Sequence, residues 1–144
     1  MMKAMILQLV TAFLASYGFS MVFGLRRRFL LPAGLGGLLC WGLYLGMGTL
    51  AHSEFLSCLI ASAFAVIYAE VLARSLKTPA TLFVVPAILP LVPGGSLYYT
   101  MENAVHGRME AARSFGQQTL VVALAIAAGI SFVVALRELQ ARKQ

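Results

Sequence analysis

The stretch Val84–Thr100, "VVPAILPLVPGGSLYYT", places helix-breaking residues inside a run that is apolar enough to lie in a membrane. The breakers are Pro86, Pro90, Pro93, Gly94 and Gly95. A proline lacks the N–H that would bond the carbonyl four residues back, and glycine permits the backbone angles that end a helix. The stretch therefore predicts a membrane span that is broken at "PLVPGG" into two half-helices.

Composition and hydropathy place this broken span within a larger membrane domain. The 144 residues are 60% hydrophobic and 11% charged, whereas soluble domains are nearer half apolar and a quarter charged. Apolar windows cover residues 4–24, 29–50, 55–73, 80–101 and 117–136. Each has about 20 residues, enough to cross ~30 Å of hydrocarbon as a helix. We therefore predict an all-α integral membrane protein with one transmembrane domain, residues 1–144, formed by five transmembrane helices of which the fourth is broken.

The distribution of lysine and arginine predicts the orientation. Eight of the eleven basic residues fall in the segments that follow the first, third and fifth windows, which include Arg26–Arg28 and Lys77. The positive-inside rule then puts the N-terminus outside and the C-terminus in the cytoplasm. A competing interpretation is that residues 1–20 are a cleaved signal peptide. Cleavage would leave the three arginines outside, against this rule.

The same residues exclude several classes of function. The net charge of +6 does not indicate nucleic-acid binding, because the basic residues stand in small groups between apolar runs. Cys40 and Cys58 have no CxxC spacing, and His52 and His106 have no partner motif for a metal. Clustered acids and an activated nucleophile are also missing from the sequence. We therefore expect no catalytic residues, no metal, no cofactor and no enzyme activity.

Small residues at four-residue intervals predict where the helices pack, because they let backbones approach closely in lipid. The second window has Gly42 and Gly46 in GxxxG spacing, together with Gly34, Gly36, Gly37 and Gly48. The third has Ala61, Ala65 and Ala69, and the fifth has Ala123, Ala127, Ser131 and Ala135. Such faces suit a compact bundle and also a homo-oligomer. Residues 102–116 predict a short amphipathic helix on the outer membrane surface.

The break itself predicts a binding site. Irregular backbone at membrane depth is tolerated only where it is buried in protein or lines a watery cavity. The amides that open the second half-helix can hold a carboxylate, and discontinuous helices of this kind carry substrate in secondary transporters. The candidate substrate-binding residues are Pro90, Pro93, Gly94, Gly95, Ser96 and Tyr99. We also expect Ser96 to cap a second half-helix that begins near Leu97.

Glu70 is the only acidic residue inside an apolar window. An unpaired carboxylate there would be costly, and intramembrane acids are usually functional or near a helix end. Glu70 precedes Arg74 by four residues, the favourable order for a helical ion pair. Two interpretations of Glu70 and Arg74 stay open: an interfacial ion pair, or a site that couples transport to protons or another ion.

Residues 69–101, "AEVLARSLKTPATLFVVPAILPLVPGGSLYYTM", resemble the signature of the threonine/serine exporter family. The match is to the short membrane subunit of its two-gene bacterial form, which is also linked to succinate export. "GFSMVFGLRRRFLLPAGLGGLLCWGLYL" is similar to the family's first two spans, and "AIAAGI" to its last. The resemblance implies a bacterial inner membrane and a larger partner subunit with five spans and a cytoplasmic domain. By the same resemblance, Glu70, Arg74, Pro90, Pro93 and Gly94 belong to the motif.

These observations converge on a hypothesis of export. The chain would be a membrane subunit that exports small carboxylates, either threonine and serine or succinate, by alternating access. No nucleotide-binding GxxxxGK[ST] motif is present, so the proton gradient would supply the energy. The alternative is a non-transporting scaffold that assembles or stabilises the larger subunit. The residues do not rank threonine against succinate, because both carry carboxylates and no arginine clamp lies within a span.

Overall fold

The structure, a computed structural model, describes residues 2–141, and most of them are helical. The elements are α1 (Met2–Val22), α2 (Arg27–Ala51), α3 (Glu54–Leu76), α4 (Thr81–Ile88), the 3₁₀ turn η1 (Leu89–Leu91), α5 (Gly94–Val105) and α6 (Met109–Ala141). Among the described residues, four helices are long and apolar enough to cross a membrane. A fifth span results if the bent pair of residues 81–91 and 94–105 is counted as one. The prediction of an all-α membrane protein is confirmed.

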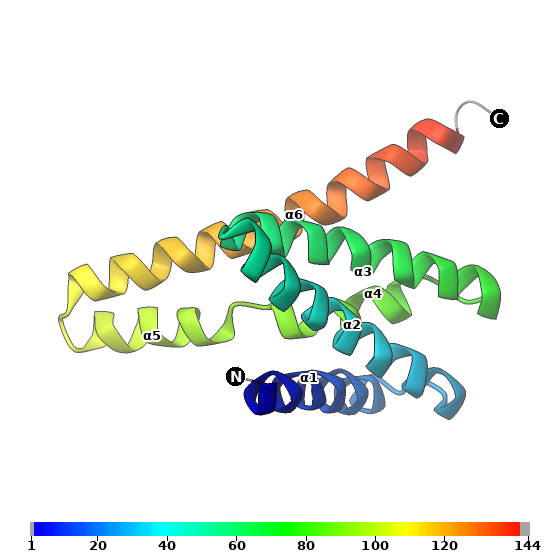
Figure 1. Ribbon diagram of the computed structural model, residues 1–144, viewed down its shortest axis with the longest axis horizontal. Coiled ribbons are helices and arrows are strands. Elements are labelled where there is room, and N and C mark those ends of the chain that lie inside the picture. The colour runs from blue at the N-terminus through cyan, green and yellow to red at the C-terminus, as the bar shows by residue number, and fades with distance from the viewer. Residues whose placement is uncertain (1, 142–144) are drawn as a thin grey trace.

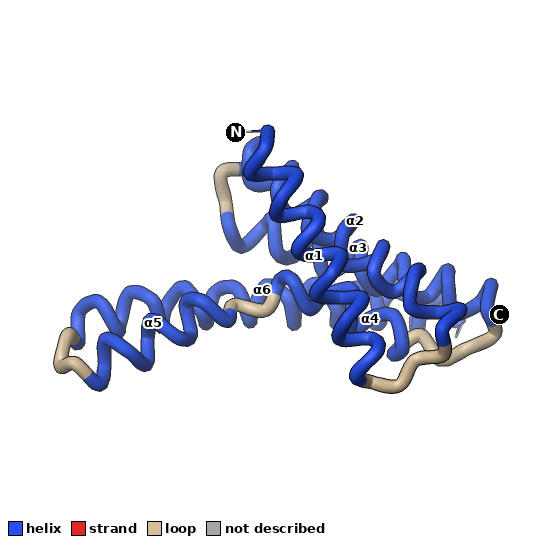
Figure 2. Tube along the Cα trace, turned by 90° about the horizontal axis from the view of Figure 1, so that it is seen from below, coloured by secondary structure: helices blue, strands red, loops and turns tan. Residues whose placement is uncertain are grey.

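The helices pack mainly against neighbours in the chain (Figure 1). The helix α2 lies between α1 and α3, and α4 packs against both α2 and α3. The helix α6 packs along α3, and α5 packs along α6. Figures 1 and 2 show that α5 and the first half of α6 project from the other helices as a two-helix arm. The break between α4 and α5 therefore lies where this arm leaves the bundle.

The predicted break in the fourth span is present, and its residues explain its position. The axes of the two halves differ by 52°. Pro86 sits inside α4, Pro90 lies in η1 and Pro93 is the N-cap of α5. Prolines are tolerated at helix starts, where the missing N–H would have no intrahelical partner. The chain therefore bends between Leu89 and Pro93.

The second half-helix begins earlier than the sequence predicts. It starts at Gly94, so Ser96 lies in its first turn and does not cap it. The Ser96 hydroxyl instead donates a hydrogen bond of 3.2 Å to the carbonyl of Pro93. The expectation that Gly94 would end a helix was wrong here: Gly94 begins α5, because glycine is free to adopt helical angles as well as those that end a helix.

Small residues determine how closely α1, α2 and α3 approach. Ala61, Ala65 and Ala69 are fully buried, which confirms the predicted face of α3. On α2 the close contacts are at Gly34, Gly36 and Gly37, which confirms these three of the predicted glycines. A Cβ added at Gly37 would collide with the side chain of Ser16 on α1.

The predicted GxxxG pair and the predicted face of α6 do not form the close contacts. Gly46 is exposed with nothing within 4 Å of an added Cβ. The predicted face of α6 (Ala123, Ala127, Ser131 and Ala135) is exposed in this chain. The buried residues of α6 are instead Ala112, Val122, Ala125, Gly129 and Val133. Gly129 contacts α3 closely, so the buried face of α6 is a neighbouring one that contains valine as well as small residues.

Residues 102–116 do not form the predicted separate surface helix. The helix α5 continues to Val105, and α6 begins at Met109. Gly107 between them has φ +72°, which glycine adopts without a steric penalty. The N–H of Arg108 donates to the carbonyl of Asn103 at 2.9 Å and closes the turn. The segment is thus the tip of the arm.

We expect Gly129→Ala to weaken the contact between α3 and α6. The added Cβ would lie 2.5 Å from the carbonyl oxygen of Leu59, and overpacking of this kind costs about 1–3 kcal/mol. The matched control is Gly46→Ala, whose added Cβ meets nothing within 4 Å. Equilibrium unfolding in mixed detergent micelles measures both. Equal stability of the two variants would contradict this packing.

Candidate functional site

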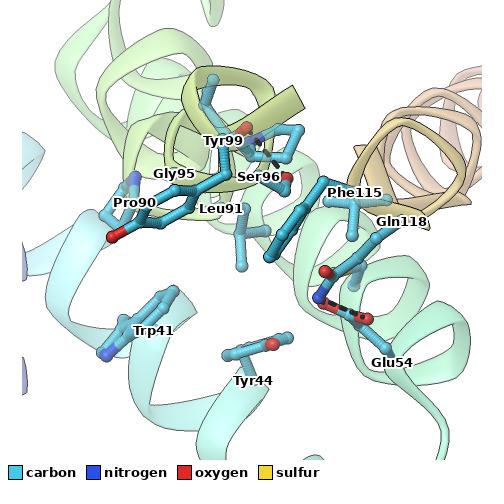
Figure 3. A pocket seen from close by; sticks show the side chains of 14 residues that line it. Trp41, Tyr44, Glu54, Pro90, Leu91, Gly95, Ser96, Tyr99, Phe115 and Gln118 are labelled. Atoms are coloured by element: carbon cyan, nitrogen blue, oxygen red, sulfur yellow. Dashed lines mark hydrogen bonds between the residues drawn. The ribbon is translucent and has the colours of Figure 1, made fainter. Parts of the chain in front are cut away.

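A cavity of about 330 Å³ lies at the break (Figure 3). Four parts of the chain form it: α2 contributes Trp41 and Tyr44, α3 contributes Glu54 and Cys58, and α6 contributes Phe115, Gln118 and Val122. Residues 90–93 and the start of α5 complete the lining. Its volume is at the lower end of the roughly 300–1,000 Å³ typical of small-molecule sites. The site is therefore sized for a small metabolite.

The structure brings together five of the six candidate substrate-binding residues. Pro90, Pro93, Gly95, Ser96 and Tyr99 all line the cavity. Gly94 does not line it, and its N–H donates to the carbonyl of Val92 at 2.7 Å. The role of these residues in binding stays a prediction, but the spatial grouping on which it depends is present.

The first turn of α5 offers free backbone donors to this cavity. The N–H of Leu97 bonds the carbonyl of Pro93 at 3.1 Å. The N–H groups of Gly95 and Ser96 have no hydrogen-bond partner among residues 2–141. Free amides and the positive end of the helix dipole favour an anion at such a position. Gly95 and Ser96 are therefore placed to hold a carboxylate.

The Ser96 hydroxyl has a mainly structural environment. Besides its bond to Pro93, it lies 3.0 Å from Oγ1 of Thr119 on α6. This contact ties the start of α5 to the wall formed by α6. The Ser96 side chain therefore holds α5 against α6, while its backbone N–H stays free to face a ligand.

Sequence reasoning missed the polar pair on the far wall. The carboxylate oxygens of Glu54 accept hydrogen bonds of 3.1 and 3.2 Å from Nε2 of Gln118 (Figure 3). Glu54 is the first residue of α3 and precedes the apolar window at residues 55–73. Sequence analysis missed Glu54 because this residue falls between two apolar windows, in a segment expected to be a loop. Its position in the cavity wall follows only from its contact with Gln118 of α6, 64 residues away in the sequence.

A second, more open cavity of about 240 Å³ lies between α1 and the break. Gln8, Thr11, Ala12 and Ala15 of α1 line it, together with residues 41 and 90. The same Trp41 and Pro90 therefore border both cavities. The indole Nε1 of Trp41 is buried and has no hydrogen-bond partner within the described chain.

Glu70 and Arg74 lie in a different place from the break. Glu70 forms an ion pair with Arg137 of α6, so the expectation of an ion pair with Arg74 was wrong. The packing of α3 against α6 turns Glu70 towards Arg137, which sequence spacing does not show. Arg74 borders the same groove of about 420 Å³ between the two helices. No lining residue is shared with the cavity at the break, and a coupling role for Glu70 and Arg74 stays a prediction.

Comparison with known families identifies the chain. It matches the family model for the threonine/serine exporter ThrE over residues 8–136. The chain therefore belongs to the threonine/serine exporter family, and is a multi-pass membrane protein of an exporter family. No curated protein and no solved structure matches it. Among residues 2–141, no group of three or more His, Cys, Asp and Glu side chains could hold a metal ion.

We expect double-mutant cycles to assign the ion pair. The cycle of Glu70→Gln with Arg137→Gln should give a coupling energy of about 0.5–3 kcal/mol, as contacting charged residues do. The cycle of Glu70→Gln with Arg74→Gln serves as the control and should give no more than about 0.2–0.5 kcal/mol, as exposed helical pairs four residues apart do. Unfolding in mixed micelles supplies the free energies. A larger coupling with Arg74 would contradict the observed pairing.

Proposed function

We propose that this chain is the membrane subunit of a secondary exporter for small carboxylate metabolites, either threonine and serine or succinate. It works with a larger five-span partner subunit that has a cytoplasmic domain. The observation that carries the proposal is the cavity at the break, bordered by the free amides of Gly95 and Ser96. In a member of an exporter family, a partly open cavity of this size at a discontinuous helix is suited to carrying substrate.

The substrate carboxylate binds at the start of α5. The amides of Gly95 and Ser96 donate to it, and the dipole of α5 stabilises its charge without a cationic side chain. The prolines are essential because they leave the backbone unwound just before these amides. Tyr99 and the neighbouring aromatic side chains form the apolar walls around the remainder of the substrate.

In the proposed alternating-access cycle, the residues between the two cavities move to connect them. Trp41 and Pro90 border both, so a displacement of these side chains would join the two cavities. The 52° bend lets α5 move with the α6 arm while α4 stays packed on α2 and α3. The proton gradient drives the cycle, with Glu70 and Arg74 as the candidate coupling residues.

In the proposed topology the N-terminus is outside and the C-terminus is in the cytoplasm of a bacterium. Figure 1 supports it, because the C-terminal ends of α1, α3 and α6 lie on the same side of the structure. These ends carry the basic segments that include Arg26–Arg28, Lys77 and Arg137. A membrane placed by the positive-inside rule then puts that side in the cytoplasm.

The scaffold hypothesis is the second candidate, and one observation favours it. The small-residue face of α6 (Ala123, Ala127, Ser131 and Ala135) is exposed, although such faces usually pack against another helix in lipid. A helix of the partner subunit or of a second copy would fit there. The two hypotheses separate if a change in the cavity abolishes export while the complex with the partner still forms.

We expect Gly95→Leu to abolish export without unfolding the chain. A Cβ at Gly95 meets nothing within 4 Å, so the new side chain would occupy the cavity rather than collide with the protein. Efflux of threonine and succinate from a complemented deletion strain should fall at least about tenfold, at unchanged protein level, because a tenfold change needs only about 1.4 kcal/mol.

The matched control for this prediction is Gly48→Leu. Gly48 is also helical and exposed, an added Cβ meets nothing within 4 Å, and the residue does not line the cavity. It should export like the wild type. Unchanged efflux of every small carboxylate in Gly95→Leu would refute the proposed site.

The proposed topology predicts which positions an impermeant thiol reagent reaches in intact cells. Lys3→Cys should be labelled from outside, whereas Lys77→Cys should be labelled only after the membrane is permeabilised. Both native cysteines are replaced by alanine for this experiment, because Cys58 lines the cavity at the break and could react. The opposite pattern would overturn the orientation.

A further inference from the structure

Glu54 contributes an unneutralised negative charge to the cavity at the break. Among residues 2–141, no Lys or Arg lines the cavity, and Glu54 takes part in neither of the ion pairs found there. Its contact with Gln118 is to a neutral amide, which holds the carboxylate in place without cancelling its charge. The site therefore has an anionic side chain available for a cationic group of a ligand.

Aromatic side chains surround the same space. The rings of Trp41 and Tyr44 of α2 lie tilted against each other with their centroids 4.9 Å apart. Tyr99 of α5 and Phe115 of α6 form a second pair at 5.4 Å. All four rings line the cavity, and Figure 3 shows them around the space that Glu54 borders. A carboxylate beside aromatic faces is the environment that proteins use to bind ammonium groups.

The anion-binding and cation-binding parts of the cavity are separate. Figure 3 shows Glu54 and Gln118 on one side, and Gly95 and Ser96 on the other. The free amides on the second side suit a carboxylate, as described above. One cavity therefore presents complementary charges to the two ends of a zwitterion.

We propose that Glu54 binds the α-ammonium group of an amino-acid substrate whose carboxylate is held at Gly95 and Ser96. This inference rests on the proposed export function and adds a specificity residue to it. It favours threonine and serine over succinate, because the Glu54 carboxylate would repel the second carboxylate of a dicarboxylate. A purely structural role for Glu54, at the start of α3, would instead affect all substrates equally.

The test compares two substrates that differ only in the amino group. A deletion strain complemented with the wild-type chain should export L-threonine at least about tenfold faster than 3-hydroxybutyrate, which lacks the ammonium. In Glu54→Gln, threonine efflux should fall at least about tenfold while 3-hydroxybutyrate efflux does not fall, since about 1.4 kcal/mol of lost recognition suffices. Glu54→Asp keeps the charge and should retain the preference for threonine.

The control variant is Glu110→Gln, which removes the same charge from an exposed residue outside the cavity. It should behave like the wild type. Equal losses for both substrates in Glu54→Gln, or succinate as the only exported compound, would overturn the inference and leave the carrier function standing. Export of none of these compounds by the wild type would overturn both.

A second measurement needs no variant and therefore does not depend on the folding of Glu54→Gln. Trp41 is the only tryptophan of the chain and lines the cavity. Its fluorescence emission in the purified full-length chain should shift with L-threonine and not with 3-hydroxybutyrate. Equal responses to the two compounds, or no response to threonine, would overturn the proposal.

Discussion

A backbone inside a bilayer must satisfy its N–H and C=O groups without water, and the chain's fourth span depends on this constraint. Three prolines remove donors from the segment, so the surrounding helices must shelter the groups that are left. Leu91 at the break is buried in one cluster with Cys40, Ala61, Ala65 and Ala87. Leu91 is thus covered by α2, α3 and α4, while Pro90, Pro93 and Gly95 border the cavity.

Close packing of small residues then sets the shape of that cavity. Gly37 lets α2 approach α1, and Gly129 lets α6 approach the backbone of α3. The approach of α6 to α3 places Gln118 against Glu54, and Thr119 next to Ser96. The walls of the site are therefore consequences of helix contacts along the lengths of α3, α5 and α6.

Local chemistry was readable from the sequence, and long-range geometry was not. Helix breaking depends on Pro90 and Pro93 themselves, so the broken span and most of its site residues could be predicted. The partner of Glu70 depends on which face α6 turns towards α3. Sequence spacing predicted Arg74, but the structure pairs Glu70 with Arg137. Glu54 enters the cavity only through a contact across 64 residues, so no local pattern could reveal it.

The central claim is that the unwound segment borders a watery, ligand-sized space within the membrane domain. Reaction of Gly95→Cys with a hydrophilic thiol reagent tests it most directly, in a chain whose Cys40 and Cys58 are replaced by alanine. Gly95 lines the cavity, and the nearby exposed Leu97 does not. The account predicts that Gly95→Cys reacts, that substrate protects it, and that Leu97→Cys in lipid is inert. An inert Gly95→Cys, or equal unprotected reaction at both positions, would contradict it.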